Sequence, residues 1–141
     1  LLTPAGDLRD LRLDVLASRG ESLLWNEYVD RYHYLGYQPL PGAQLRYFAR
    51  AEGRLLALFG FGAAAWKTAP RDRFIGWDQQ ARRRNIHLIA YNTRFLILPW
   101  VEVPHLASHL LSRMARRTSA ATPGSAIPAI GARSRACCRR I

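Results

Sequence analysis

Arginine side chains gather in the middle of the chain, where their spacing suits contact with phosphate groups. Three consecutive arginines end the segment 77–85, whose polarity predicts an exposed helix. With Arg71, Arg73 and Arg94 they could form a phosphate-contacting face for DNA or RNA. The alternative is a solvated helix end, because cations near a helix C-terminus interact favourably with the helix dipole. The candidate binding arginines are Arg71, Arg82, Arg83, Arg84 and Arg94.

Two polar residues precede a short apolar run and complete the binding candidates. Residues 95–98 are continuously apolar and end at Pro99, which predicts a buried central strand. Asn92 and Arg94 therefore lie where that strand begins, a place at which a polar side chain needs a hydrogen-bond partner or a ligand. We expect these two residues to be the most site-like in the chain.

Only two residues are candidates for acid–base chemistry. Asp72 follows Arg71, and the pair either fixes a local turn or presents a guanidinium to an anion; we favour the structural pair. His33 lies near a predicted helix end and titrates near neutrality, so it could act as a general base. A partly buried helix-end histidine is the simpler interpretation. No further enzyme signature is present, and the sequence predicts no metal site and no cofactor.

A strand-to-helix junction offers a second type of site. Leu106, Leu110 and Met114 recur every fourth residue, which predicts a helix over residues 105–117. The unpaired amide groups at a helix start commonly bind anions. The junction at residues 98–106 could therefore bind acyl-coenzyme A, although Glu102 repels phosphate and no glycine is present there.

The positive charge is concentrated at the C-terminal end. The formal net charge is +11, but residues 1–112 hold 14 basic residues against all 10 acids, and seven arginines follow. Residues 118–141 contain no acidic or aromatic residue and no regular spacing of apolar residues, so we expect a low-complexity tail. It is either a natural basic tail that contacts nucleic acid or an out-of-frame translation after a frameshift, and we favour the frameshift. Its adjacent Cys137 and Cys138 suit neither a zinc site nor a disulfide framework. Residues 1–20 are interpreted as a fragment edge and residues 21–117 as the domain.

The remaining pattern predicts one α+β domain. Helices are expected over residues 7–16 and 22–35, the second ended by Gly36, followed by a hairpin of residues 45–50 and 54–61. This order resembles the first half of an acetyltransferase-like (GNAT-like) fold. We expect Trp66, Trp77 and Trp100 to be core residues rather than base-stacking surfaces. Without a membrane-length apolar segment or a signal peptide, the expected location is the cytoplasm.

Four sequence blocks in a fixed order resemble the DruA-like family. The blocks are His33-Tyr34-Leu35-Gly36-Tyr37; Arg71-Asp72 with Phe74-Ile75-Gly76-Trp77; Asn92-Thr93-Arg94-Phe95-Leu96-Ile97-Leu98-Pro99-Trp100; and Leu106-Ala107-Ser108. The family is named for a component of the Druantia anti-phage defence system, and its members often lie near transposases and other mobile elements. The resemblance therefore implies a role in defence or mobile-element biology, with nucleic acid or proteins encoded alongside as partners. It also implies a further C-terminal block, from which this chain departs at Thr118, so a truncated or frameshifted copy is expected.

Overall fold

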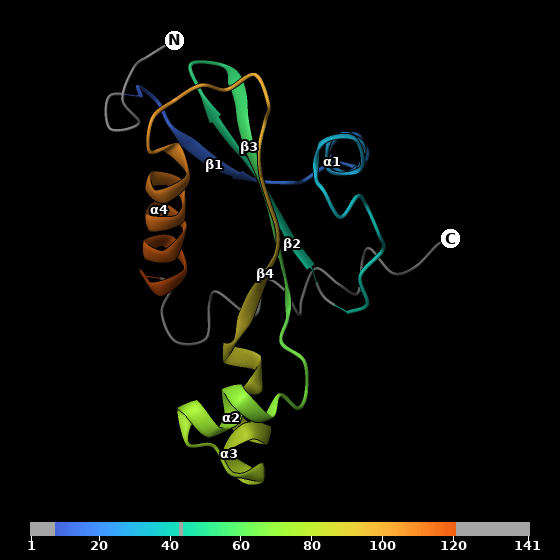
Figure 1. Ribbon diagram of the computed structural model, residues 1–141, viewed down its shortest axis with the longest axis vertical. Helices are drawn as coiled ribbons and strands as arrows, with labels where there is room; N and C mark the ends of the chain where they lie inside the picture. The colour runs from blue at the N-terminus through green and yellow to red at the C-terminus, as the bar shows by residue number, and fades with distance from the viewer. Residues whose placement is uncertain (1–7, 43, 121–141) are drawn as a thin grey trace.

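The computed structural model describes residues 8–42 and 44–120, which form a four-stranded antiparallel sheet with helices on both faces (Figure 1). The sheet order is β1-β2-β3-β4. The elements in chain order are β1 (Arg12–Val15), α1 (Arg19–Tyr32), β2 (Gln44–Ala51), β3 (Arg54–Ala63), α2 (Ala69–Ile75), α3 (Gln79–Asn85), the 3-10 helix η2 (Ile86–Leu88), β4 (Ala90–Ile97) and α4 (Leu106–Ala120). The predicted α+β class is thereby confirmed. No helix within the described residues has the length and apolar character needed to cross a membrane.

The sheet separates two apolar cores, because successive side chains of a strand point to opposite faces. On one face, Tyr47 and Ala49 of β2 pack with Leu110 of α4. On the other face, Phe48 packs with Trp25 of α1. The helix predicted over residues 105–117 is confirmed as α4, and its leucine stripe is the side that covers the sheet.

The first predicted helix is wrong. Residues 12–15 of the segment 7–16 form β1, which pairs with β2 so that Leu13 lies opposite Ala49. Leu11 and Leu13 are buried while Arg12 between them is exposed, which is the two-residue period of a strand. The helical spacing of the leucines was therefore overridden by pairing with a distant strand.

The second predicted helix is confirmed as α1, but with different ends. Ser18 caps its first turn by accepting from the Glu21 N–H, and the Glu21 carboxylate accepts from the Ser18 N–H in a reciprocal capping box. The helix ends at Tyr32, so Gly36 is not its cap. Gly36 instead has a φ of +61° in the turn that follows, a conformation that favours glycine.

The hairpin is confirmed as β2 and β3, joined by a turn in which Glu52 and Gly53 both have positive φ. The strand that contains residues 95–97 is β4, but it is not central. β4 pairs with β3 and lies at the end of the four-stranded order, so it is an edge strand of the described sheet. Leu96 and Leu98 are nevertheless buried against α1, which explains the apolar run. The likeness to an acetyltransferase fold stays a prediction.

Candidate functional site

A small helical lobe, residues 64–89, connects β3 to β4 and extends away from the sheet (Figure 1). Thr68 and Pro70 start α2, Gly76 ends it with a φ of +80°, and the Asp78 side chain caps α3 by accepting from the Ala81 N–H. Local sequence thus specifies both short helices. Their packing depends on one buried carboxylate.

Asp72 joins the two helices of the lobe. Arg71 donates to its Oδ1 from Nε and Nη2 at 2.9 and 2.7 Å, and Arg82 donates to its Oδ2 from Nη1 at 2.9 Å. The Asp72 side chain is only 9% exposed, and the guanidinium of Arg82 lies over the ring of Trp66. Burial alone would raise the pKa of Asp72, but hydrogen bonds from the two arginines outweigh it and lower that pKa. Both carboxylate oxygens are therefore occupied by structural partners.

This geometry supports the structural interpretation of Arg71 and Asp72 and extends it to Arg82. The two guanidinium groups are largely buried, so neither presents an open face to phosphate. Arg82 links α3 to Asp72 of α2, whereas Arg71 links Asp72 to the carbonyls of Ala65 and Trp66 in the segment before α2. The interpretation of residues 77–85 as one exposed helix applies to Arg83 and Arg84, which are exposed, but not to Arg82. A spacing pattern could not separate three adjacent arginines, because the partner of Arg82 lies ten residues away.

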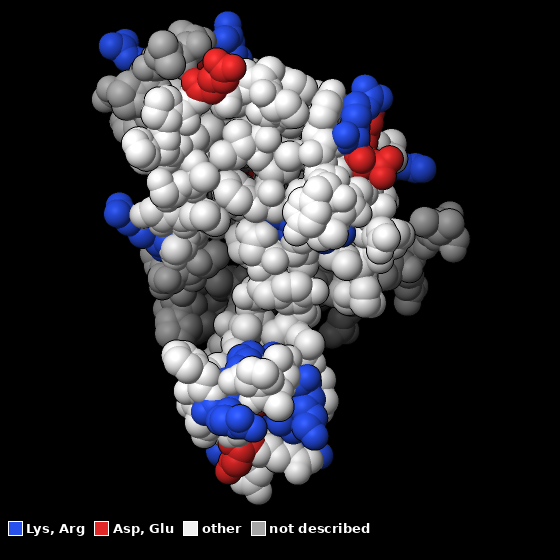
Figure 2. Space-filling view, in the orientation of Figure 1, with Lys and Arg blue, Asp and Glu red and all other residues white. Residues whose placement is uncertain are grey.

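The exposed cations of the lobe are Lys67, Arg73, Arg83 and Arg84. Among residues 8–42 and 44–120, none of these four side chains forms an ion pair. Figure 2 shows Lys and Arg side chains over much of the lobe, whereas the neighbouring part of the sheet domain is mostly uncharged in that view. The lobe therefore forms a basic surface that water, an anion or a phosphate backbone can reach.

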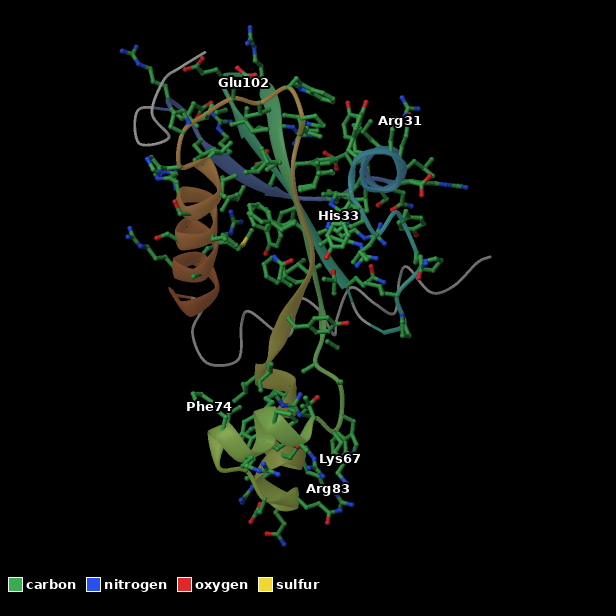
Figure 3. The ribbon with its side chains drawn as sticks, viewed as in Figure 1. Arg31, His33, Lys67, Phe74, Arg83 and Glu102 are labelled. Atoms are coloured by element: carbon green, nitrogen blue, oxygen red, sulfur yellow. The ribbon has the colours of Figure 1, made fainter. Side chains whose placement is uncertain are left out.

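Aromatic side chains accompany these cations. Phe74 is 93% exposed and projects from the lobe, as its label in Figure 3 shows. Asp72 points toward α3, and Phe74, two residues later on the same helix, lies about 200° around the axis from it.

Trp66 and Trp100 are also about half exposed, so the expectation that they are core residues is wrong. The buried tryptophan is Trp25, which packs between α1 and the sheet.

The second group of predicted residues lies where the chain leaves α1. His33 caps the helix end, and its Nδ1 accepts a hydrogen bond from the Leu35 N–H at 3.2 Å. Arg94 of β4 donates to the Gly36 carbonyl at 3.4 Å and to the Thr93 carbonyl at 2.7 Å. The fold thus brings the blocks that contain His33 and Arg94 together, although they are far apart in sequence.

The surroundings of His33 favour its neutral imidazole form. Burial lowers its pKa below the ordinary value, and the nearby positive charge of Arg94 lowers it further. In the neutral form Nδ1 accepts the hydrogen bond from Leu35, so the ring proton of that form lies on Nε2. A neutral histidine can act as a base, but the contacts of His33 give it a structural role at the helix end. Asn92 is exposed on β4, opposite Phe61 and between the lobe and Arg94 along the strand.

Arg46 is a site-like residue that the sequence did not single out. Its guanidinium lies 4.7 Å from the ring centroid of Trp25 and 5.9 Å from that of Tyr37, and it donates to Asn26 at 2.8 Å. The only sequence signal was its place in an alternating strand. No group of three or more His, Cys, Asp or Glu side chains that could hold a metal ion occurs in the described part of the chain.

The predicted strand-to-helix junction lines a pocket of about 410 Å³. Leu98, Trp100 and Val103 belong to its wall, but the acidic side chains of Glu52 and Glu102 line it too. Two carboxylates oppose the pyrophosphate of acyl-coenzyme A, and among the described residues that line the pocket the only cation is Arg54. The lining therefore argues against the acyl-coenzyme A hypothesis at residues 98–106.

The fold and these sites define an α+β protein whose antiparallel sheet carries a basic helical lobe between two adjacent strands. The family model described as Druantia protein DruA matches residues 3–122, so the chain belongs to the DruA family. The resemblance that four sequence blocks indicated is thereby confirmed, and membership indicates an anti-phage defence protein of the Druantia type. No curated protein and no solved structure matches the chain significantly.

Proposed function

We propose that this DruA family protein binds the phosphate backbone of DNA or RNA through the exposed cations of its helical lobe. The observation that carries the proposal is the charge of residues 64–89, which hold six basic residues against two acids. One of those acids, Asp72, is already used by Arg71 and Arg82 inside the lobe. The remaining four cations therefore face solvent without a neutralising acid from the described sheet domain.

Buried ion pairs and exposed cations have different tasks in this arrangement. The Asp72 cluster fixes α2 against α3, so that the exposed arginines are presented on a rigid support rather than on a loop. Arg73 comes from α2, whereas Arg83 and Arg84 come from α3. Phosphate contacts from two elements would set the orientation of a nucleic acid without reading its sequence.

Phe74 supports a preference for unpaired bases. A nearly fully exposed phenylalanine forgoes the burial that normally stabilises such a ring by about 2 kcal/mol. Aromatic side chains beside basic residues commonly stack on the bases of single strands. We therefore expect single-stranded nucleic acid to bind more tightly than a duplex of the same length, and Phe74→Ala to remove this difference.

The test measures binding of the full chain to fluorescently labelled single- and double-stranded oligonucleotides by anisotropy over a range of salt concentrations. The basic segment beyond the described residues needs its own variant, in which Arg133, Arg135, Arg139 and Arg140 become Ala. If binding survives in that variant, the described domain contributes it. If binding vanishes, the charge of the C-terminal segment explains the affinity and the proposed function fails. Proteins encoded with the same defence or mobile element remain proposed partners, for which co-purification is the corresponding test.

A further inference from the structure

A pocket at the end of the molecule opposite the lobe has a lining that suits a different ligand. Figure 3 shows Glu102 at that end and Phe74 in the lobe at the other. The pocket, about 410 Å³ in volume, lies between the β2–β3 turn and the loop that joins β4 to α4, with Tyr28 contributed by α1. This volume falls in the range of small-molecule sites.

One wall of the pocket is apolar and aromatic. Leu55, Leu56 and Leu98 supply the aliphatic surface, and Tyr28 and Trp100 supply the rings. The rings of Tyr28 and Trp100 meet edge to face, with centroids 6.2 Å apart, so each keeps a face that does not stack on the other. Trp100 is 56% exposed, which leaves its ring accessible from solvent.

The acidic side chains of the pocket have no partner in the described structure. Glu52 and Glu102 both line the pocket, and neither forms an ion pair or hydrogen bond with residues 8–42 or 44–120. Within the described part of the chain, Arg54 is the single cation in the lining, so these lining residues carry more negative than positive charge in a chain whose net charge is +11. Carboxylates next to aromatic rings attract organic cations.

Residues with positive φ occur in the loops around the same pocket. Among the described residues, the non-glycine residues with positive φ are Asp10, Glu52 and His105, at 55°, 52° and 59°. Glu52 lines the pocket, and the other two lie two residues from the lining residues Leu8 and Val103. Aspartate and histidine adopt positive φ more readily than most residues, and Glu52 with Gly53 forms the tight turn of the β2–β3 hairpin, so these angles fix the loops that border the pocket.

We infer that this pocket binds an organic cation, an amine or guanidinium carried on an apolar stem. The stem would pack on the leucines and the two rings, and the charge would lie between Glu52 and Glu102. The cation could be a free small molecule or a lysine or arginine side chain of a peptide. Both sources present the same chemistry, and both are distinct from the phosphate ligand proposed for the lobe.

The test uses three probes that share one ring and differ in charge: phenethylammonium, 2-phenylethanol and phenylacetate. Binding to the isotope-labelled full chain is followed by the NMR signal of the Trp100 indole N–H, assigned with Trp100→Phe. We expect phenethylammonium to bind more tightly than either analogue. Glu52→Gln and Glu102→Gln should each weaken its binding by about two- to fivefold, the range for exposed charge pairs. The matched control is Glu27→Gln, an exposed carboxylate of α1 outside the pocket lining, which should leave the affinity unchanged.

A second pair of probes separates the two sources of the cation. If acetyl-Phe-Lys-amide binds more tightly than phenethylammonium, the pocket receives a peptide side chain; if it binds more weakly, a free cation fits better. Acetyl-Phe-Glu-amide is the charge-reversed control. The inference is overturned if phenylacetate or the alcohol binds as tightly as phenethylammonium. It is also overturned if no probe shifts the Trp100 signal, or if both glutamate variants bind phenethylammonium like the wild type.

Discussion

Replacing Arg73, Arg83 and Arg84 together with Ala should weaken nucleic-acid binding and, more specifically, make it less dependent on salt. Each phosphate contact contributes about 0.9 to the slope of log affinity against log salt on duplex DNA, and about 0.7 on a single strand. Loss of three contacts should therefore lower the slope by about 2.7 on duplex or about 2.1 on single strands. Between about 50 and 200 mM salt, the affinity of the wild type for duplex should fall about 40-fold more than that of the variant.

The assay is fluorescence anisotropy of the full chain with labelled oligonucleotides at several salt concentrations. The charge-matched control replaces Arg19, Arg113 and Arg116 with Ala, because these exposed arginines lie outside the lobe on α1 and α4. The control removes the same charge from the chain but no lobe cation, so its slope should stay close to that of the wild type.

Two results would refute the reasoning about the lobe. A lobe variant with an unchanged slope would show that these arginines do not contact phosphate. Equal losses in the lobe variant and the charge-matched control would show that net charge, rather than the lobe surface, determines binding. In either case the basic surface would be a solvated face of two short helices.

Three further predictions concern stability. Asp72→Asn removes the negative charge that pairs the two buried guanidinium groups. It should therefore lower amide-exchange protection in α2 and α3 but not in β2 and β3. A uniform loss of protection across the chain would contradict a local role for Asp72. Gly60→Ala should destabilise the protein by about 1–3 kcal/mol in denaturant unfolding, because the new Cβ would lie 2.9 Å from Thr93 Oγ1 and 3.1 Å from Trp25. An unchanged unfolding midpoint would mean that Thr93 and Trp25 move aside without cost. Folding lowers the pKa of His33 below its unfolded value of 6.5. The contribution of neutral His33 to the free energy of unfolding is therefore fully present above pH 6.5 and is lost as the pH falls through the folded pKa. His33→Gln should therefore reduce the fall in Tm between about pH 7 and pH 5, and equal pH profiles would contradict the shift.

Elements whose signals are local could be predicted from the amino-acid sequence. The turn at Glu52 and Gly53 between two apolar runs specified the β2–β3 hairpin, and the fourfold spacing of Leu106, Leu110 and Met114 specified α4. The pairing of adjacent Arg71 and Asp72 was also predictable, because the two residues are neighbours in the chain. The resemblance to the DruA family could also be recognised from the order of four sequence blocks, because that order is visible without a structure.

Features that depend on a contact with a residue far away in the chain were set by the tertiary structure. Leu11 and Leu13 suited a helix until pairing with β2 made residues 12–15 a strand. Arg82 and Arg83 are indistinguishable in sequence, yet one is buried against Asp72 and the other is exposed, because the packing of α3 on α2 selects one helix face. The sequence singled out the junction at residues 98–106, but it could not show that Glu52 and the β2–β3 turn border the same pocket, since the two loops are distant in the chain. Local patterns fix the conformation of a segment, whereas burial and charge pairing depend on which segments the fold places side by side.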